Sequence, residues 1–167
     1  MVLRINEDYE EYENDDYVDY DDESTQEAYY RIAEDNVRNL FGDYASISED
    51  SFSMWDSGGY PGLCCEFTMY IDQFATEVFN KYKNELFRKS SIEWFNFDAD
   101  REIECEATVK RIGSYDVSVS VTDISGSDYD VNQMFDDGEF MYALNEKIRE
   151  LVEAKLENVD VLISDAF

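Results

Sequence analysis

Apolar residues along the chain follow the period of a helix in some segments and the period of a strand in others. They recur every three or four positions in residues 25–41, 73–89 and 139–157, and this spacing predicts three amphipathic helices. Ser24 opens a capping-box sequence before the first of them, and Gly42 follows its last apolar residue. We therefore expect the first helix to begin at residue 25 and to end at residue 41.

Between the predicted helices, apolar and polar residues alternate with a period of two, which is typical of half-buried strands. Two pairs of such segments flank turn-forming residues and predict two β-hairpins. The first hairpin pairs residues 51–56 with 63–71 and the second pairs residues 101–109 with 115–121. We also expect a short aromatic strand over residues 92–97 and a closing edge strand at Val159, Val161 and Ile163.

This order of elements predicts an α+β fold in which a mainly antiparallel sheet of hairpins is backed by about three helices. With 167 residues, of which 44% are hydrophobic, the chain is long enough for a substantial core. We expect one domain over residues 24–167, preceded by an acidic N-terminal tail over residues 1–23.

The tail concentrates the most unusual composition of the chain. Residues 6–23 hold eleven carboxylates and no base, and four tyrosines lie 3, 5 and 3 positions apart, a spacing that would place them on one face of a helix. A solvated tail without helical structure is the alternative, because like charges on a helix repel one another. The candidate partner-binding residues of the tail are Tyr9, Tyr12, Asp15, Asp16, Tyr17, Asp19, Tyr20, Asp21 and Asp22.

Negative charge also dominates the rest of the chain. The 41 Asp and Glu residues outnumber the 13 Lys and Arg residues, which gives a formal net charge of −28. Such a charge opposes binding to phosphate backbones and anionic membranes and favours a basic partner. Adaptation to high salt would also give an acidic surface, but the 13 tyrosines and 11 phenylalanines are unlike the composition of salt-adapted proteins.

Glu102, Glu104 and Glu106 alternate with the apolar residues of the clearest predicted strand. Their side chains should lie about 6.7 Å apart on one face of that strand, because side chains on one face are two residues apart. This repeat is of the same order as the spacing of successive phosphates on one nucleic-acid strand. A solvent-exposed face of an ordinary half-buried strand is the alternative interpretation.

A second acidic segment spans residues 123–139, where we expect a solvated loop. Four of its carboxylates, Asp128, Asp130, Asp136 and Asp137, are further candidates for partner binding. The spacing within the segment is similar to that of an EF-hand calcium loop, although Gln133 stands where that loop requires glycine. The candidate calcium ligands are Asp128, Asp130, Asn132, Asp136 and Glu139.

Catalytic chemistry has little support in the sequence. Histidine is absent, so no Ser-His-Asp triad or Cys-His pair can form, and no phosphate-binding or dinucleotide-binding motif is present. We expect no enzyme activity and no cofactor. Cys64, Cys65 and Cys105 form no disulfide framework and are expected to be packing thiols in a reducing cytosol. We expect neither a signal peptide nor a membrane span.

In size, charge, the tyrosine-rich acidic tail and the carboxylate ladder, the chain resembles the small acidic inhibitors of bacteriophages and mobile elements, the anti-CRISPR and anti-restriction DNA mimics. The resemblance is one of composition and includes no alignable motif. It implies a stoichiometric inhibitor in the cytoplasm of a bacterial host cell, which occupies the basic DNA- or RNA-binding cleft of a CRISPR effector or restriction nuclease and does not itself bind nucleic acid. An acidic immunity or chaperone-like partner of a basic protein and a calcium-binding module are the alternatives.

Overall fold

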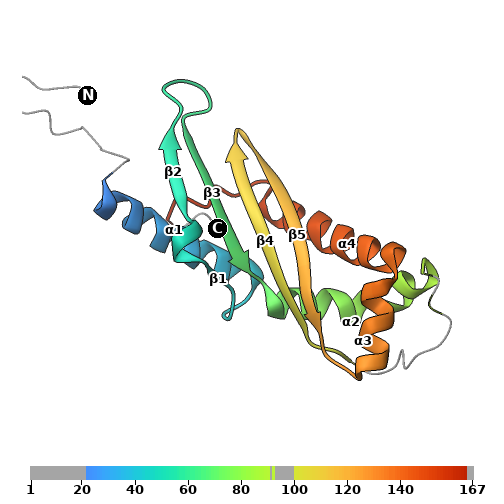
Figure 1. Ribbon diagram of the computed structural model, residues 1–167. Helices are drawn as coiled ribbons and strands as arrows, with labels where there is room; N and C mark the ends of the chain where they lie inside the picture. Colours follow the sequence, from blue (N-terminus) through green and yellow to red (C-terminus); the bar gives the residue numbers. More distant parts are fainter. Residues whose placement is uncertain (1–21, 91, 93–99, 165–167) are drawn as a thin grey trace, which may run out of the picture.

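The computed structural model describes residues 22–90, 92 and 100–164 (Figure 1). Four α-helices, one short 3-10 helix and five strands follow one another in these residues. The helices are α1 (Glu23–Phe41), α2 (Asp72–Arg88), α3 (Asp128–Asp136) and α4 (Gly138–Leu156), and the 3-10 helix is η2 (Glu49–Ser51). The strands are β1 (Ser46–Ile47), β2 (Ser53–Asp56), β3 (Leu63–Tyr70), β4 (Ile103–Ile112) and β5 (Ser114–Ile124).

All strand pairs of the sheet are antiparallel. The long strands lie in the order β3, β4, β5, and β1 and β2 both pair with the other edge of β3. The β4–β5 hairpin pairs Val109 with Val117 and Ala107 with Val119, and one irregularity occurs between Glu104 and Cys105. The expected α+β class with a mainly antiparallel sheet is therefore confirmed.

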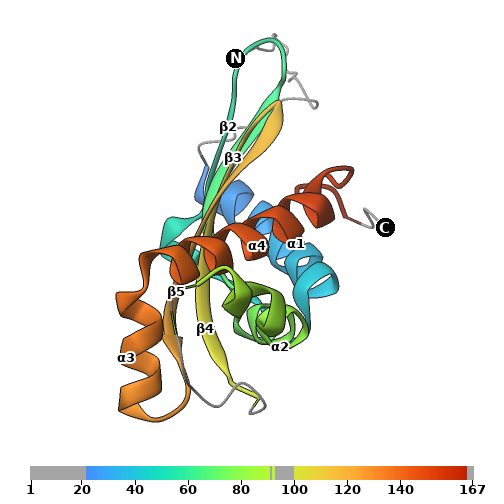
Figure 2. The ribbon, with the colours of Figure 1, turned by 90° about the vertical axis from the view of Figure 1, so that its right-hand side faces the viewer.

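Helices α1, α2 and α4 cover one face of the sheet (Figure 2). Alternate residues of β4 point into this layer and are buried, as the strand pattern predicts. Helix α4 buries one residue per turn against the sheet, at spacings of four. The buried β4 residues are Ile103, Cys105, Ala107 and Val109, and those of α4 are Phe140, Leu144, Ile148, Val152 and Leu156.

Most of the predicted elements lie within a few residues of the observed ones. The two hairpins and the three long helices are all present. The first helix, however, begins at Glu23, because the carboxylate of Asp22 accepts a hydrogen bond from the Ser24 backbone N–H and caps the helix. The capping residue is therefore Asp22, and the prediction of Ser24 was wrong. Of the strand expected over residues 92–97 only Ile92 is described, and it belongs to no helix or strand.

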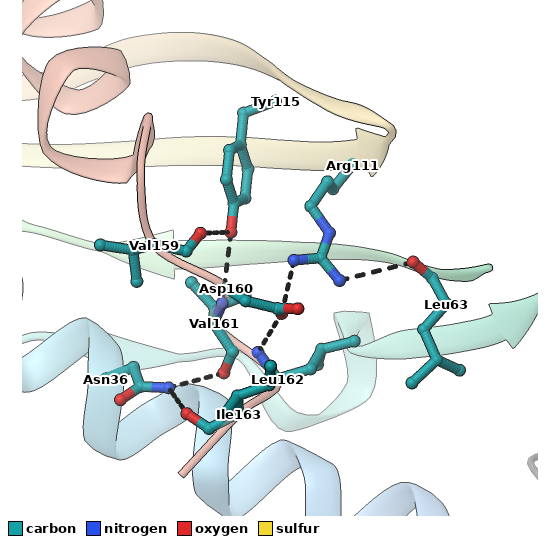
Figure 3. A network of polar contacts seen from close by, with 9 residues as sticks. All are labelled: Asn36, Leu63, Arg111, Tyr115, Val159, Asp160, Val161, Leu162 and Ile163. Atoms are coloured by element: carbon teal, nitrogen blue, oxygen red, sulfur yellow. Dashed lines mark hydrogen bonds and ion pairs between the residues drawn. The ribbon is translucent and has the colours of Figure 1, made fainter. Parts of the chain in front are cut away.

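The expected closing strand at Val159, Val161 and Ile163 does not form. These residues lie after α4 in a segment without helix or strand, and Val161 is fully buried. Side chains bind their backbone in place of a neighbouring strand (Figure 3): the Asn36 amide donates to the carbonyl oxygens of Val161 and Ile163, at 2.8 and 3.0 Å. The alternation of apolar residues here reflects packing of a turn segment between α1 and the sheet.

Arg111 and Tyr115 hold the same segment from the side of the sheet (Figure 3). The buried Arg111 guanidinium pairs with the carboxylate of Asp160. The Tyr115 hydroxyl donates to the Val159 carbonyl at 2.6 Å and accepts from the Val161 backbone N–H at 3.2 Å. Burial raises the pKa of Tyr115, so the hydroxyl keeps the proton that it donates.

Asp160→Ala should lower the free energy of unfolding by about 1–3 kcal/mol, because it leaves the buried Arg111 guanidinium without its charged partner. Urea denaturation measures this change. Glu157→Ala removes an exposed carboxylate three residues earlier and is expected to have a much smaller effect. Equal stability of the two variants would contradict the role assigned to Asp160.

Candidate functional site

The face of the sheet opposite α1, α2 and α4 carries most of the polar strand residues. Every second residue of β4, from Glu104 to Ile112, is exposed on it. Serine, threonine and aspartate occupy the exposed positions of β5. We define the acidic sheet face as the carboxylates that the strand alternation places on this side: Glu66, Glu102, Glu104, Glu106, Asp116 and Asp123.

Helix α2 fixes the orientation of the β4 residues that carry the glutamate ladder. Beyond the end of β3, three polar side chains of α2 hydrogen-bond the backbone of residues 101, 103 and 105. The Cys105 N–H donates to Asp72 at 2.8 Å, the Ile103 N–H to Thr76 at 2.9 Å and the Arg101 N–H to Asn80 at 3.0 Å. The spacing i, i+4, i+8 gives these side chains one face of the helix.

The opposite edge of the same segment pairs with β5 and the residue after it. The Ser125 N–H donates to the Glu102 carbonyl at 2.9 Å, and the Glu102 N–H donates to the Ser125 hydroxyl at 2.8 Å. The backbone of the ladder is therefore hydrogen-bonded on both edges, and Glu102, Glu104 and Glu106 must point to the open face. This confirms the predicted direction of the three side chains and makes the acidic sheet face a preorganised surface.

No carboxylate of the acidic sheet face forms an ion pair with another described residue. Carboxylates of the helices do form such pairs: Glu34 with Arg38, and both Glu146 and Glu153 with Arg149. Lys110 is the one described base whose side chain the alternation places on the open face, where it lies opposite Glu66 and Asp116. The ladder end of the face thus has no neutralising base among the described residues.

Two of these carboxylates are direct cross-strand neighbours. Glu104 of β4 lies opposite Asp123 of β5. Like charges at opposite positions of an antiparallel pair destabilise the sheet. The Glu104–Asp123 pair therefore lowers the stability of the sheet, and its presence has no explanation in the stability of the fold.

Aromatic and aliphatic side chains lie among and beside these charges. Tyr70 of β3 is opposite Glu106 and is 40% exposed. At the other end of the face, alternation brings Trp55 and Ile112 to the open side, and Ile112 is 52% exposed. Tyr60, 95% exposed, lies in the loop that projects beyond β2 and β3 (Figure 1). The sequence pattern did not predict that Tyr70 lies next to Glu106, because this contact depends on the register of β3 against β4.

The second acidic segment forms structure that we did not expect. Residues 123–139 include the end of β5, all of α3 and the first turn of α4, so the expectation of a solvated loop was wrong. Ser127 caps α3 by accepting from the Asp130 N–H at 3.2 Å. Gly126, at φ +141°, lies so close to Arg101 that a Cβ atom there would clash with the guanidinium.

The helical structure of this segment also contradicts its interpretation as a calcium-binding loop. Four of the five candidate ligands lie along helix α3 and Glu139 lies in the first turn of α4, instead of surrounding one point as an EF-hand loop requires. Among the residues that the structure describes, no group of three or more acidic or cysteine side chains could hold a metal ion. The interpretation of Asp128, Asp130, Asn132, Asp136 and Glu139 as calcium ligands was wrong.

Three candidate partner-binding residues have roles inside the fold. Asp130 pairs with the buried Arg101 guanidinium at 3.2 Å. Asp137 is buried and caps α4 by accepting from the Phe140 N–H at 2.8 Å, and Asp22 caps α1. These contacts engage all three carboxylates within the fold, so the carboxylates are not available to a partner.

The remaining candidates divide into exposed and undescribed residues. Asp128 and Asp136 are exposed on α3. Helix α3 follows β5 at the end of the sheet where β4 begins (Figure 1). The tail candidates lie outside the described residues: Tyr9, Tyr12, Asp15, Asp16, Tyr17, Asp19, Tyr20 and Asp21.

All three cysteines are free and buried. Burial raises the pKa of the Cys65 thiol to about 11 and that of the Cys105 thiol to about 12. Both groups therefore stay protonated at neutral pH and are poor nucleophiles. This agrees with the expected packing role.

Comparison with protein-family models, with curated proteins and with solved structures finds no match to this chain. None of the helices in the described part of the chain is both long and apolar enough to span a membrane.

Proposed function

We propose that the protein is a stoichiometric inhibitor that presents carboxylates in place of nucleic-acid phosphates to the basic cleft of a bacterial defence nuclease, either a CRISPR effector or a restriction enzyme. It would act without catalysis or a cofactor, in the cytoplasm of the host cell. The observation that carries this proposal is the set of carboxylates on the acidic sheet face, which form no ion pair with a described residue and are held outward by a backbone that is hydrogen-bonded on both edges.

Preorganisation is what distinguishes this surface from a merely acidic one. A flexible acidic segment must be ordered when it binds, and that ordering weakens the complex. The hydrogen-bonded backbone already places the ladder side chains at two-residue intervals of about 6.7 Å on one strand, and those of β5 lie on the next strand, about 4.8 Å away. Lys and Arg side chains that bind successive phosphates would therefore meet an ordered array of oxygen acceptors.

The exposed aromatic residues supply a second part of the proposed interface. Charge mainly accelerates encounter and selects the partner, whereas buried aromatic anchors slow dissociation. Tyr70 lies opposite Glu106 of the ladder, and Tyr60 and Ile112 lie at the other end of the face. The face thus combines both kinds of contact over the length of the long strands.

Competition with nucleic acid tests the proposal. Purified CRISPR effectors and restriction nucleases would be immobilised free and after saturation with their own duplex DNA or guide RNA. We expect binding to the free form of the target and strong loss of binding to the loaded form, because both ligands need the same basic cleft. Equal affinity for the two forms would contradict mimicry and would favour an acidic partner that binds elsewhere on the target.

A further inference from the structure

The helix side of the molecule carries an apolar groove that differs in charge from the rest of the surface. It lies between α2 and α4, has a volume of about 330 Å³, and is lined by Phe74, Val78 and Tyr82 of α2 and by Leu151 of α4. Besides one exposed carboxylate, Glu77, the rim carries two exposed lysines, Lys81 and Lys155. Their ammonium groups lie 5.4 Å from the centre of the Tyr82 ring and 5.8 Å from that of the Phe74 ring, respectively.

Neither rim lysine has a carboxylate partner among the described residues. This is unexpected in a chain with 41 carboxylates and 13 bases, where most of the described bases do form ion pairs. An apolar floor with two unpaired cations at the rim suits a ligand that combines aromatic rings with negative charge. Phosphate groups alone would leave the apolar floor uncovered.

We infer that this groove binds the N-terminal tail of the same chain. Residues 1–21 carry nine carboxylates and one base, and four tyrosines lie among these charges. Tyrosine rings would cover the apolar floor while the neighbouring carboxylates pair with Lys81 and Lys155.

The length of the tail permits this docking. The tail joins the described residues at Asp22, at the start of α1, which lies on the same side of the sheet as the groove (Figures 1 and 2). Twenty-one extended residues span up to about 70 Å. The 19-residue α1 measures about 28 Å in length. An extended tail is therefore more than twice as long as this helix, which is long enough to reach the groove.

A spin label on the tail of the full chain tests the inference. Asn14→Cys provides an accessible thiol for a nitroxide, because Cys64, Cys65 and Cys105 are buried. In isotope-labelled protein at low ionic strength, we expect the amide signals around Lys81 and Lys155 to lose intensity compared with the same sample after reduction of the nitroxide. Signals from the acidic sheet face should keep their intensity.

Charge reversal then identifies the contacts. The double variant Lys81→Glu with Lys155→Glu should abolish the intensity loss. Lys110→Glu is the control and should leave the loss unchanged, because Lys110 is exposed on the opposite, open face and forms no ion pair with a described residue. Tyr12→Ser with Tyr17→Ser should also abolish it without altering any described contact. Unchanged groove signals in the labelled protein, or a loss that persists in the double lysine variant, would overturn the inference. A loss seen only when labelled and isotope-enriched chains are mixed would assign the groove to the tail of a second copy.

Discussion

Replacement of Glu102, Glu104 and Glu106 by glutamine is expected to slow association with the target about tenfold at low ionic strength, because electrostatic attraction raises association rates by about 10–10³-fold. Glutamine keeps the size of each side chain and removes only its charge. Raising the ionic strength from about 0.01 M to 0.15 M shortens the Debye length from about 30 Å to about 8 Å. The on-rate of the unaltered protein should therefore fall steeply with salt, and that of the triple variant should fall less. Dissociation should change little, since it depends more on aromatic anchors.

A matched control separates the position of the charges from their number. Glu139, Glu150 and Glu157 are exposed on or just after α4, on the other side of the sheet, and form no ion pair with a described residue. Their replacement by glutamine changes the net charge by the same amount. Stopped-flow kinetics would measure both triple variants. An equal effect of the two triple variants would mean that overall charge acts without a specific surface, and an on-rate indifferent to salt would contradict the mimic proposal.

The long elements could be predicted from the sequence because their periodicity coincides with burial. The alternation in β4 and the four-residue spacing in α4 each reflect one buried face. Helix α3 was missed for a physical reason: it has only nine residues, and of these only Met134 is buried, so no repeated buried position marks the helix in the sequence. The Ser127 cap and the ion pair of Asp130 with Arg101 stabilise it, and Arg101 is too distant in sequence to appear in a local pattern.

The candidate site was only partly predictable for a related reason. Strand alternation placed Glu102, Glu104 and Glu106 on one face correctly. That Asp123 and Tyr70 lie beside these glutamates follows only from the register of β3, β4 and β5. Alternation alone does not determine this register. Within the acidic segments, composition could not separate the exposed Asp128 from Asp137, whose carboxylate is a buried helix cap.

The surface charge of this protein makes its core especially important for stability. A net charge of −28 opposes the compact state by self-repulsion, so buried apolar contacts must offset a larger cost than in a neutral domain. Three phenylalanines concentrate this packing between α2 and α4. The rings of Phe87 and Phe140 stack with centroids 4.8 Å apart and planes at 6°, and Phe79 meets Phe140 edge to face at 6.4 Å.

Phe140→Ala is therefore expected to lower the free energy of unfolding by about 3–5 kcal/mol, the usual range for removal of a buried phenylalanine. Phe140 is fully buried, and its loss would open a cavity and remove both ring contacts. Since small domains are stable by about 5–15 kcal/mol, the variant should unfold at a much lower urea concentration. Tyr142→Ala, two residues further along α4 with a side chain that is 69% exposed, serves as the control and should change stability little. Similar unfolding midpoints for the two variants would show that the phenylalanine cluster does not carry the stability that its burial implies.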